Sequence, residues 1–124
     1  MANLLVVDDN EYISELYAQE LTDEGHSVSL AGSGFQALEH LKAQHPDLIV
    51  LDIAMPDMDG IETMRRIQAI DRVIPVILNT AFATYQDEYA TWPANAYVIK
   101  SGDLTELKTR IRELLDVFSR QSKK

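Results

Sequence analysis

Apolar and polar positions follow two alternating periods along the chain. Short apolar runs occur at Leu4–Val7, Leu48–Leu51, Val76–Asn79 and Tyr97–Ile99, and between them apolar side chains recur every three or four residues. Short continuous runs are typical of strands buried on both faces of a parallel sheet, and the longer periodic stretches are typical of amphipathic helices. Followed along the whole chain, of which these four runs are the clearest strands, the alternation predicts five strand–helix repeats.

Helix boundaries carry their own signals. The first predicted helix, over residues 11–24, has an apolar stripe and is followed by Gly25 in the position of a C′ residue. Capping boxes at 33–36, 59–62 and 103–106 predict further helices that begin near residues 34, 60 and 104. A short fourth helix is expected over 84–92, before Pro93.

These elements predict an α/β fold with a doubly wound, five-stranded parallel sheet. Right-handed crossovers favour the strand order 2-1-3-4-5, with the switch point between the first and third strands. The 124 residues are expected to form a single domain, 1–124, with enough chain to bury a core.

Composition narrows the function classes. A net charge of -9 disfavours direct binding of nucleic acid, because phosphate contacts need clustered basic residues. The absence of cysteine removes disulfides, thiolate catalysis and zinc–thiolate sites. Apolar stretches fall far short of the ~20 residues of a membrane span, and acids stand near the start where a signal peptide would be basic. We therefore expect a cytoplasmic protein without membrane partners.

Chemically useful side chains follow the predicted strands. They are Asp8, Asp9, Asp52, Thr80 and Lys100, and either Asp57 or Asp59 is expected to supply a fourth nearby carboxylate. Because ligands of open α/β sheets bind at the carboxyl ends of the strands, these side chains are expected to share one crevice.

Three carboxylates in one crevice repel one another. Either they share a proton, which raises a pKa, or they bind a hard cation through oxygen. Mg²⁺ suits the second case, and a carboxylate beside it is a competent nucleophile toward phosphorus. Lys100 would supply positive charge and Thr80 a donor to phosphoryl oxygens.

Four segments together carry a resemblance to a known family. They are VVDDN at 6–10, LIVLDIAMPDMDG at 48–60, NTA at 79–81 and AYVIK at 96–100. In this order and spacing the chain resembles the receiver domain of two-component response regulators, most of all a stand-alone receiver of the chemotaxis type. The resemblance implies a flavodoxin-like (βα)5 fold.

The resemblance also implies roles for individual residues. Asp52 would accept a phosphoryl group from the phosphohistidine of a sensor histidine kinase or phosphotransfer protein. Asp9, Asp52 and the backbone carbonyl of Ala54 would bind Mg²⁺, with Asp8 acting mainly through water. Thr80 and Lys100 would hold the phosphoryl oxygens.

A switch is implied as well. Inward movement of Thr80 would let Tyr97 turn inward, which changes the face made by the fourth helix, the fifth strand and the fifth helix. A downstream protein, unknown from the sequence, would read that face.

Two features depart from the family pattern. Ser101, instead of proline, follows Lys100, and because a cis bond without proline costs about 2.5 to 4 kcal/mol we expect a trans peptide there. The positions that tune phosphoryl lifetime in the family hold Ala54 and Phe82, neither of which orients water, so slow self-hydrolysis is expected.

Three alternatives stay open. An aspartate-nucleophile phosphatase shares the Asp, Thr and Lys set, but Ala54 stands where such enzymes place a general acid. The chain would look the same as the receiver part of a longer regulator with an output domain. A pseudo-receiver scaffold is disfavoured by the full set of acids, Thr80 and Lys100. The leading interpretation is a phosphoacceptor that is not a turnover enzyme.

Overall fold

Five parallel strands form one sheet in the order β2-β1-β3-β4-β5, as the sequence predicts. The computed structural model describes residues 2–81 and 94–122. The strands are β1 Asn3–Val7, β2 Ser27–Ala31, β3 Leu48–Leu51, β4 Val76–Thr80 and β5 Ala96–Ile99. β1 pairs with both β2 and β3, so the switch point lies between β1 and β3.

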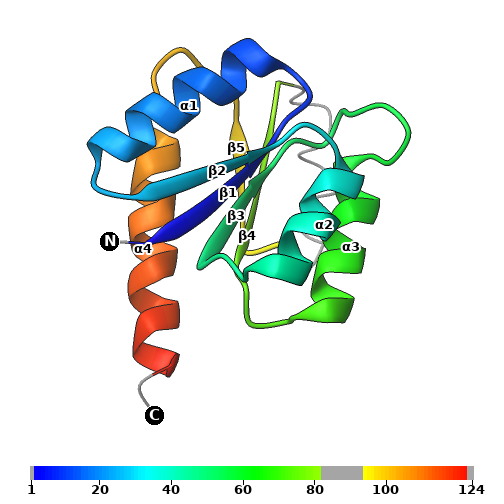
Figure 1. The fold of residues 1–124 in the computed structure, drawn as a ribbon. Helices are drawn as coiled ribbons and strands as arrows, with labels where there is room; N and C mark the ends of the chain where they lie inside the picture. The colour runs from blue at the N-terminus through cyan, green and yellow to red at the C-terminus, as the bar shows by residue number, and fades with distance from the viewer. Residues whose placement is uncertain (1, 82–93, 123–124) are drawn as a thin grey trace.

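Helices cover both faces of the sheet (Figure 1). They are α1 Glu11–Asp23, α2 Gly34–Ala43, α3 Gly60–Ile70 and α4 Thr105–Ser122. α1 and α4 lie on one face, and α2 and α3 lie on the other. The helix expected over 84–92 lies outside the described residues. Within 2–81 and 94–122, no helix is both long enough and apolar enough to cross a membrane.

Side-chain caps explain where most of these helices begin. Ser33 and Asp59 accept hydrogen bonds from the amides of Gln36 and Glu62, which confirms the predicted starts at 34 and 60. α1 ends as expected, since Gly25 has a φ of 100°. α4 starts at Thr105, one residue later than predicted, because Asp103 accepts from the amide of Thr105 instead of that of Glu106.

The core has two layers, one on each face of the sheet. Beneath α1 and α4, Tyr17, Leu21 and Ile111 pack on strand residues such as Val6 and Ile77. The other layer joins α2 and α3 to the opposite face. Because both faces are covered, β1, β3 and β4 are buried almost along their whole length, which is why they read as continuous apolar runs.

Gly34 allows α2 and α3 to pack closely. A Cβ at this position would lie 2.2 Å from Oγ1 of Thr63 and 2.7 Å from Cε of Met58. Both distances are shorter than real carbon contacts, so an added methyl group must displace the side chains of Thr63 and Met58, which lie on α3 and on the loop before it.

We therefore predict that Gly34→Ala lowers the free energy of unfolding by about 1 to 3 kcal/mol, even though alanine favours helix. Urea denaturation measures this loss. Gly102→Ala is the matched control, since its added Cβ would meet no atom of the described chain within 4 Å and should change stability by less than about 0.5 kcal/mol. Equal effects at the two positions would contradict the proposed steric cause.

Candidate functional site

The site is built at the carboxyl ends of three strands. Asp8 follows β1, Asp52 follows β3 and Lys100 follows β5. The amide of Asp52 donates to the carbonyl of Val7 at 2.9 Å, which continues the pairing of β1 with β3 by one step. Neighbouring strands therefore bring Asp8 and Asp52 together although they are far apart in sequence.

Three carboxylates meet here. One carboxylate oxygen from each of Asp8, Asp9 and Asp52 lies within 4.8 Å of the others. Asp8 and Asp52 are only 3% and 6% exposed, while Asp9 is open to solvent. An all-oxygen donor set of this charge, with one open side, fits a hard divalent cation that keeps several waters.

The prediction of a fourth carboxylate is wrong for the described residues. Asp59 points its carboxylate at the amide of Glu62 and caps α3. Asp57 is exposed, with a φ of 69°, and does not join the cluster. Both acids belong to the turn that leads into α3. They are close to Asp52 in sequence, but this turn directs their side chains away from the cluster.

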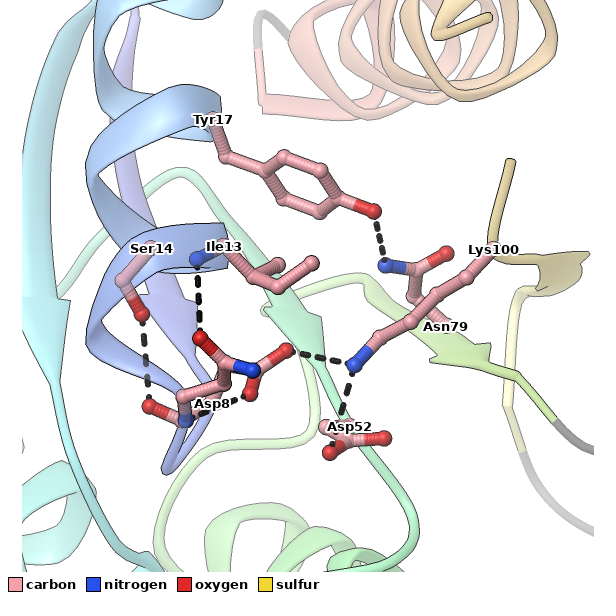
Figure 2. A network of polar contacts seen from close by, with 8 residues as sticks. Asp8, Ile13, Ser14, Tyr17, Asp52, Asn79 and Lys100 are labelled. Atoms are coloured by element: carbon pink, nitrogen blue, oxygen red, sulfur yellow. Dashed lines mark hydrogen bonds and ion pairs between the residues drawn. The ribbon is translucent and has the colours of Figure 1, made fainter. Parts of the chain in front are cut away.

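Lys100 lies between the two buried acids (Figure 2). Its Nζ is 2.7 Å from Oδ2 of Asp8 and 3.4 Å from Oδ2 of Asp52. Burial lowers the pKa of Lys100, but the hydrogen bond to Asp8 and the charges of Asp52 and Asp8 together raise it by more, so the pKa lies above its ordinary value. Lys100 is therefore a fixed ammonium ion.

Asp8 is held by the start of α1. Its Oδ1 accepts the amide of Asn10 at 2.9 Å, and its carbonyl accepts the hydroxyl of Ser14 at 3.3 Å. Asn10 is itself the N-cap of α1, since its side chain accepts from the amide of Ile13. The helix and the acid are thus fixed to each other.

Asp52 has an unusual proton affinity. Burial raises its pKa most, the charge of Asp8 raises it further, and Lys100 and the amide of Ala54 partly oppose the rise. Together the protein groups raise the pKa of Asp52 to about 6. A carboxylate so desolvated is more basic than an ordinary one, and its charged form is stabilised by a nearby cation.

The loop after Asp52 approaches it closely. The amide of Gly60 donates to the carbonyl of Ile53 at 2.8 Å, and a Cβ at Gly60 would lie 2.1 Å from the carbonyl oxygen of Asp52. The structure shows that any larger residue there would push α3 away from the acid.

The remaining predicted residues are placed as follows. Thr80 ends β4, is fully buried, and its carbonyl accepts the amide of Lys100 at 2.7 Å. Tyr97 is half-buried on β5, and Ala54 is exposed. The bond between Lys100 and Ser101 is trans, as expected. Phe82 lies outside the described residues.

One buried polar pair beside the site is absent from the sequence predictions. Nδ2 of Asn79, on β4, donates to the hydroxyl of Tyr17, on α1, at 3.0 Å (Figure 2). The only signals were a polar residue inside an apolar run and a tyrosine on an apolar stripe.

Fold and site together define a class. A doubly wound parallel sheet carries, at its switch point, an acidic cluster that is neutralised in part by a lysine from the edge strand. This is the architecture of a receiver of the flavodoxin-like type. Residues 4–112 match the family of the response regulator receiver domain, and the chain belongs to that family.

Known relatives agree. The chain is 39% identical to the transcriptional regulatory protein AfsQ1 of Streptomyces coelicolor, over 98% of this chain and 55% of AfsQ1. It is 34% identical to the probable transcriptional regulatory protein TcrX of Mycobacterium tuberculosis, over 90% of this chain and 49% of TcrX. The chain thus spans about half the length of these curated relatives.

Solved structures give the same result. The response regulator TrrA of Thermotoga maritima, in complex with Mg²⁺ and BeF, has a TM-score of 0.87 and 37% identity, over 92% of this chain and 99% of TrrA. A CheY-like receiver domain protein of Methanospirillum hungatei has a TM-score of 0.90 and 26% identity, over 98% of each chain.

The raised pKa of Asp52 predicts a pH-dependent cost of folding. The folded protein holds the proton of Asp52 more tightly than the unfolded chain, so this cost is absent below about pH 4 and complete above about pH 6. In buffer with a chelator, Asp52→Asn should therefore be more stable than wild type at pH 7.5, by roughly 1 to 2 kcal/mol after allowance for solvent screening.

Urea denaturation of both proteins at pH 4 and pH 7.5 measures this difference. The gain should disappear at the lower pH. A gain of the same size at both pH values would mean that ionisation of Asp52 is not its cause.

Proposed function

We propose that this protein is a Mg²⁺-dependent phosphoacceptor of a two-component phosphorelay. Asp52 takes a phosphoryl group from the phosphohistidine of a sensor histidine kinase or a phosphotransfer protein. The observation that carries the proposal is the setting of Asp52, a buried carboxylate of raised pKa within 4.8 Å of two further acids and 3.4 Å from an ammonium group.

Each acid has a distinct proposed task. Asp9, Asp52 and the backbone carbonyl of Ala54 would hold the cation, and Asp8 would act mainly through water. Bound Mg²⁺ would neutralise charge on the carboxylates and on the phosphoryl oxygens. The open position of Asp9 and the burial of Asp8 agree with this division, since Asp8 is already engaged with Lys100.

Transfer requires one new bond and one broken bond. An oxygen of Asp52 attacks phosphorus, the bond from phosphorus to the histidine nitrogen breaks, and that nitrogen keeps the electron pair and takes a proton. Charge spreads over three phosphoryl oxygens, so donors and cations around them matter more than acid–base groups. Lys100 and the hydroxyl of Thr80 serve as those donors.

The signal would leave the site through β4 and β5. Thr80 moves toward the phosphoryl group and Tyr97 turns inward, which remodels the surface of β5, of α4 and of the segment between β4 and β5 for a downstream protein. The carbonyl of Thr80 already accepts the amide of Lys100. A solved complex of the histidine kinase ThkA with TrrA, to which this chain is 37% identical with a TM-score of 0.86, supports a kinase as the upstream partner.

The alternatives stand as follows. A phosphatase that turns over external substrates would place an acid at position 54, where the chain has alanine, so we propose an acceptor and not a turnover enzyme. Residues 1–124 would form a single receiver domain, either alone or as part of a longer regulator. The acidic charge of -9 disfavours direct contact of this domain with nucleic acid.

Phosphorylation at Asp52 is directly testable. With phosphoramidate and Mg²⁺, wild-type protein should gain the mass of one phosphoryl group in intact-mass spectrometry, and Asp52→Ala should gain nothing. A chelator should abolish the gain. Asp57→Asn, at an exposed acid of the same loop, is the matched control and should behave as wild type. No gain in wild type, or an equal gain in Asp52→Ala, defeats the proposal.

The phosphoryl group is expected to be long-lived. Ala54 carries no group that can orient an attacking water, so the purified phosphorylated protein should decay over times well beyond seconds. Ala54→Asn supplies an amide at this exposed position and should shorten the lifetime several-fold. Loss of the phosphoryl mass over time measures both rates, and decay of wild type within seconds would contradict this expectation.

A further inference from the structure

Asn79 is a polar side chain inside the core. It is 2% exposed and lies on β4 in line with Ile77, in the layer that contains Tyr17. Its Nδ2 donates to Tyr17, but its Oδ1 has no partner in the described part of the chain. A buried acceptor without a partner costs free energy, so its presence calls for an explanation.

Tyr17 fixes the direction of this amide. Because the hydroxyl of Tyr17 takes the nitrogen end, the carbonyl end must point away from α1 (Figure 2). The charges of the site also act on the hydroxyl of Tyr17. Burial raises its pKa most, the hydrogen bond to Asn79 and the charge of Lys100 lower it, and Asp8 and Asp52 raise it, so the pKa lies above its ordinary value. The pair thus lies within electrostatic range of the acidic cluster.

Lys100 reaches the same face of the sheet. Asn79 is in register with Val98 on β5, and side chains alternate along a strand, so Lys100 lies on the same side as Val98 and Asn79. An ammonium group has three donors. Asp8 accepts one of them at 2.7 Å and Asp52 forms an ion pair with the ammonium at 3.4 Å, and among the side chains described in 2–81 and 94–118 no other acceptor engages it.

We infer that Asn79 is a positioning residue for Lys100, oriented by Tyr17. The unpaired carbonyl of Asn79 accepts the third ammonium proton of Lys100 as the lysine moves from Asp8 toward the phosphoryl group on Asp52. This inference rests on the proposed function and deepens it. It pairs the buried carbonyl of Asn79 with the ammonium of Lys100, which lie on neighbouring strands and on the same face of the sheet.

Initial rates of phosphorylation by phosphoramidate at saturating Mg²⁺ test the inference. Asn79→Leu, which removes both polar atoms, should lower the rate about tenfold, the size expected for one hydrogen bond to a charged group. Tyr17→Phe should lower it less, and should have no further effect when Asn79 is already leucine.

Dependence on Lys100 separates positioning from a structural role. In a Lys100→Met background, whose slow phosphorylation is followed over long times by mass, Asn79→Leu should cause no further loss. The NMR signal of the Lys100 ammonium group should also shift in Asn79→Leu. Thr63→Val, which removes a buried hydroxyl on α3, should lower the melting temperature without either change.

The outcomes are distinct. Wild-type rates in both Asn79→Leu and Tyr17→Phe, or equal fold losses with and without Lys100, overturn the inference and leave the proposed function intact. Failure of wild type to accept a phosphoryl group overturns the proposed function instead.

Discussion

The mutual repulsion of the carboxylates at the ends of β1 and β3 is the constraint on which the rest of the structure depends. The strand order makes Asp8 and Asp52 neighbours, and burial deprives them of most of the water that would screen their charges. The same order supplies the remedy. β5 is the edge strand next to β4, which in turn pairs with β3. From there the long side chain of Lys100 reaches both acids.

Such a cluster needs a frame that cannot relax away from it. Continued backbone pairing beyond β1 and β3 fixes Asp8 and Asp52, and the start of α1 fixes Asp8 again through Asn10. On the far side, the lack of a side chain at Gly60 lets α3 begin against the backbone of Asp52. Apolar layers on both faces then hold the strands themselves. The acids cannot separate without unpairing strands or opening the core, so their repulsion is retained in the folded protein.

Most of the fold could be predicted from the sequence. Apolar runs, caps and turns are local signals of strands and helices, and the right-handed crossover rule then favours the strand order. The meeting of Asp8, Asp9, Asp52 and Lys100 could also be predicted, since it needs only the strand ends and the strand order. Side-chain direction within a loop could not, and neither Asp57 nor Asp59 supplies the expected fourth carboxylate. The contact between Tyr17 and Asn79 joins residues 62 positions apart, and it depends on how a helix face lies over one strand, which no local signal records.

The unequal sharing of Lys100 gives the two buried acids different surroundings. Its ammonium is closer to Asp8, at 2.7 Å, than to Asp52, at 3.4 Å, so the first acid is neutralised more fully than the second. Asp52 keeps a raised pKa and hence more basicity than an ordinary carboxylate. A closer contact of Lys100 with Asp52 would lower the pKa of Asp52 and make its carboxylate less basic. Under the proposed function, a bound cation would neutralise the remaining charge on Asp52, and the phosphoryl group would bind to the same carboxylate. Binding of the cation would then be favoured because it reduces the repulsion between Asp52 and Asp8 that the fold imposes.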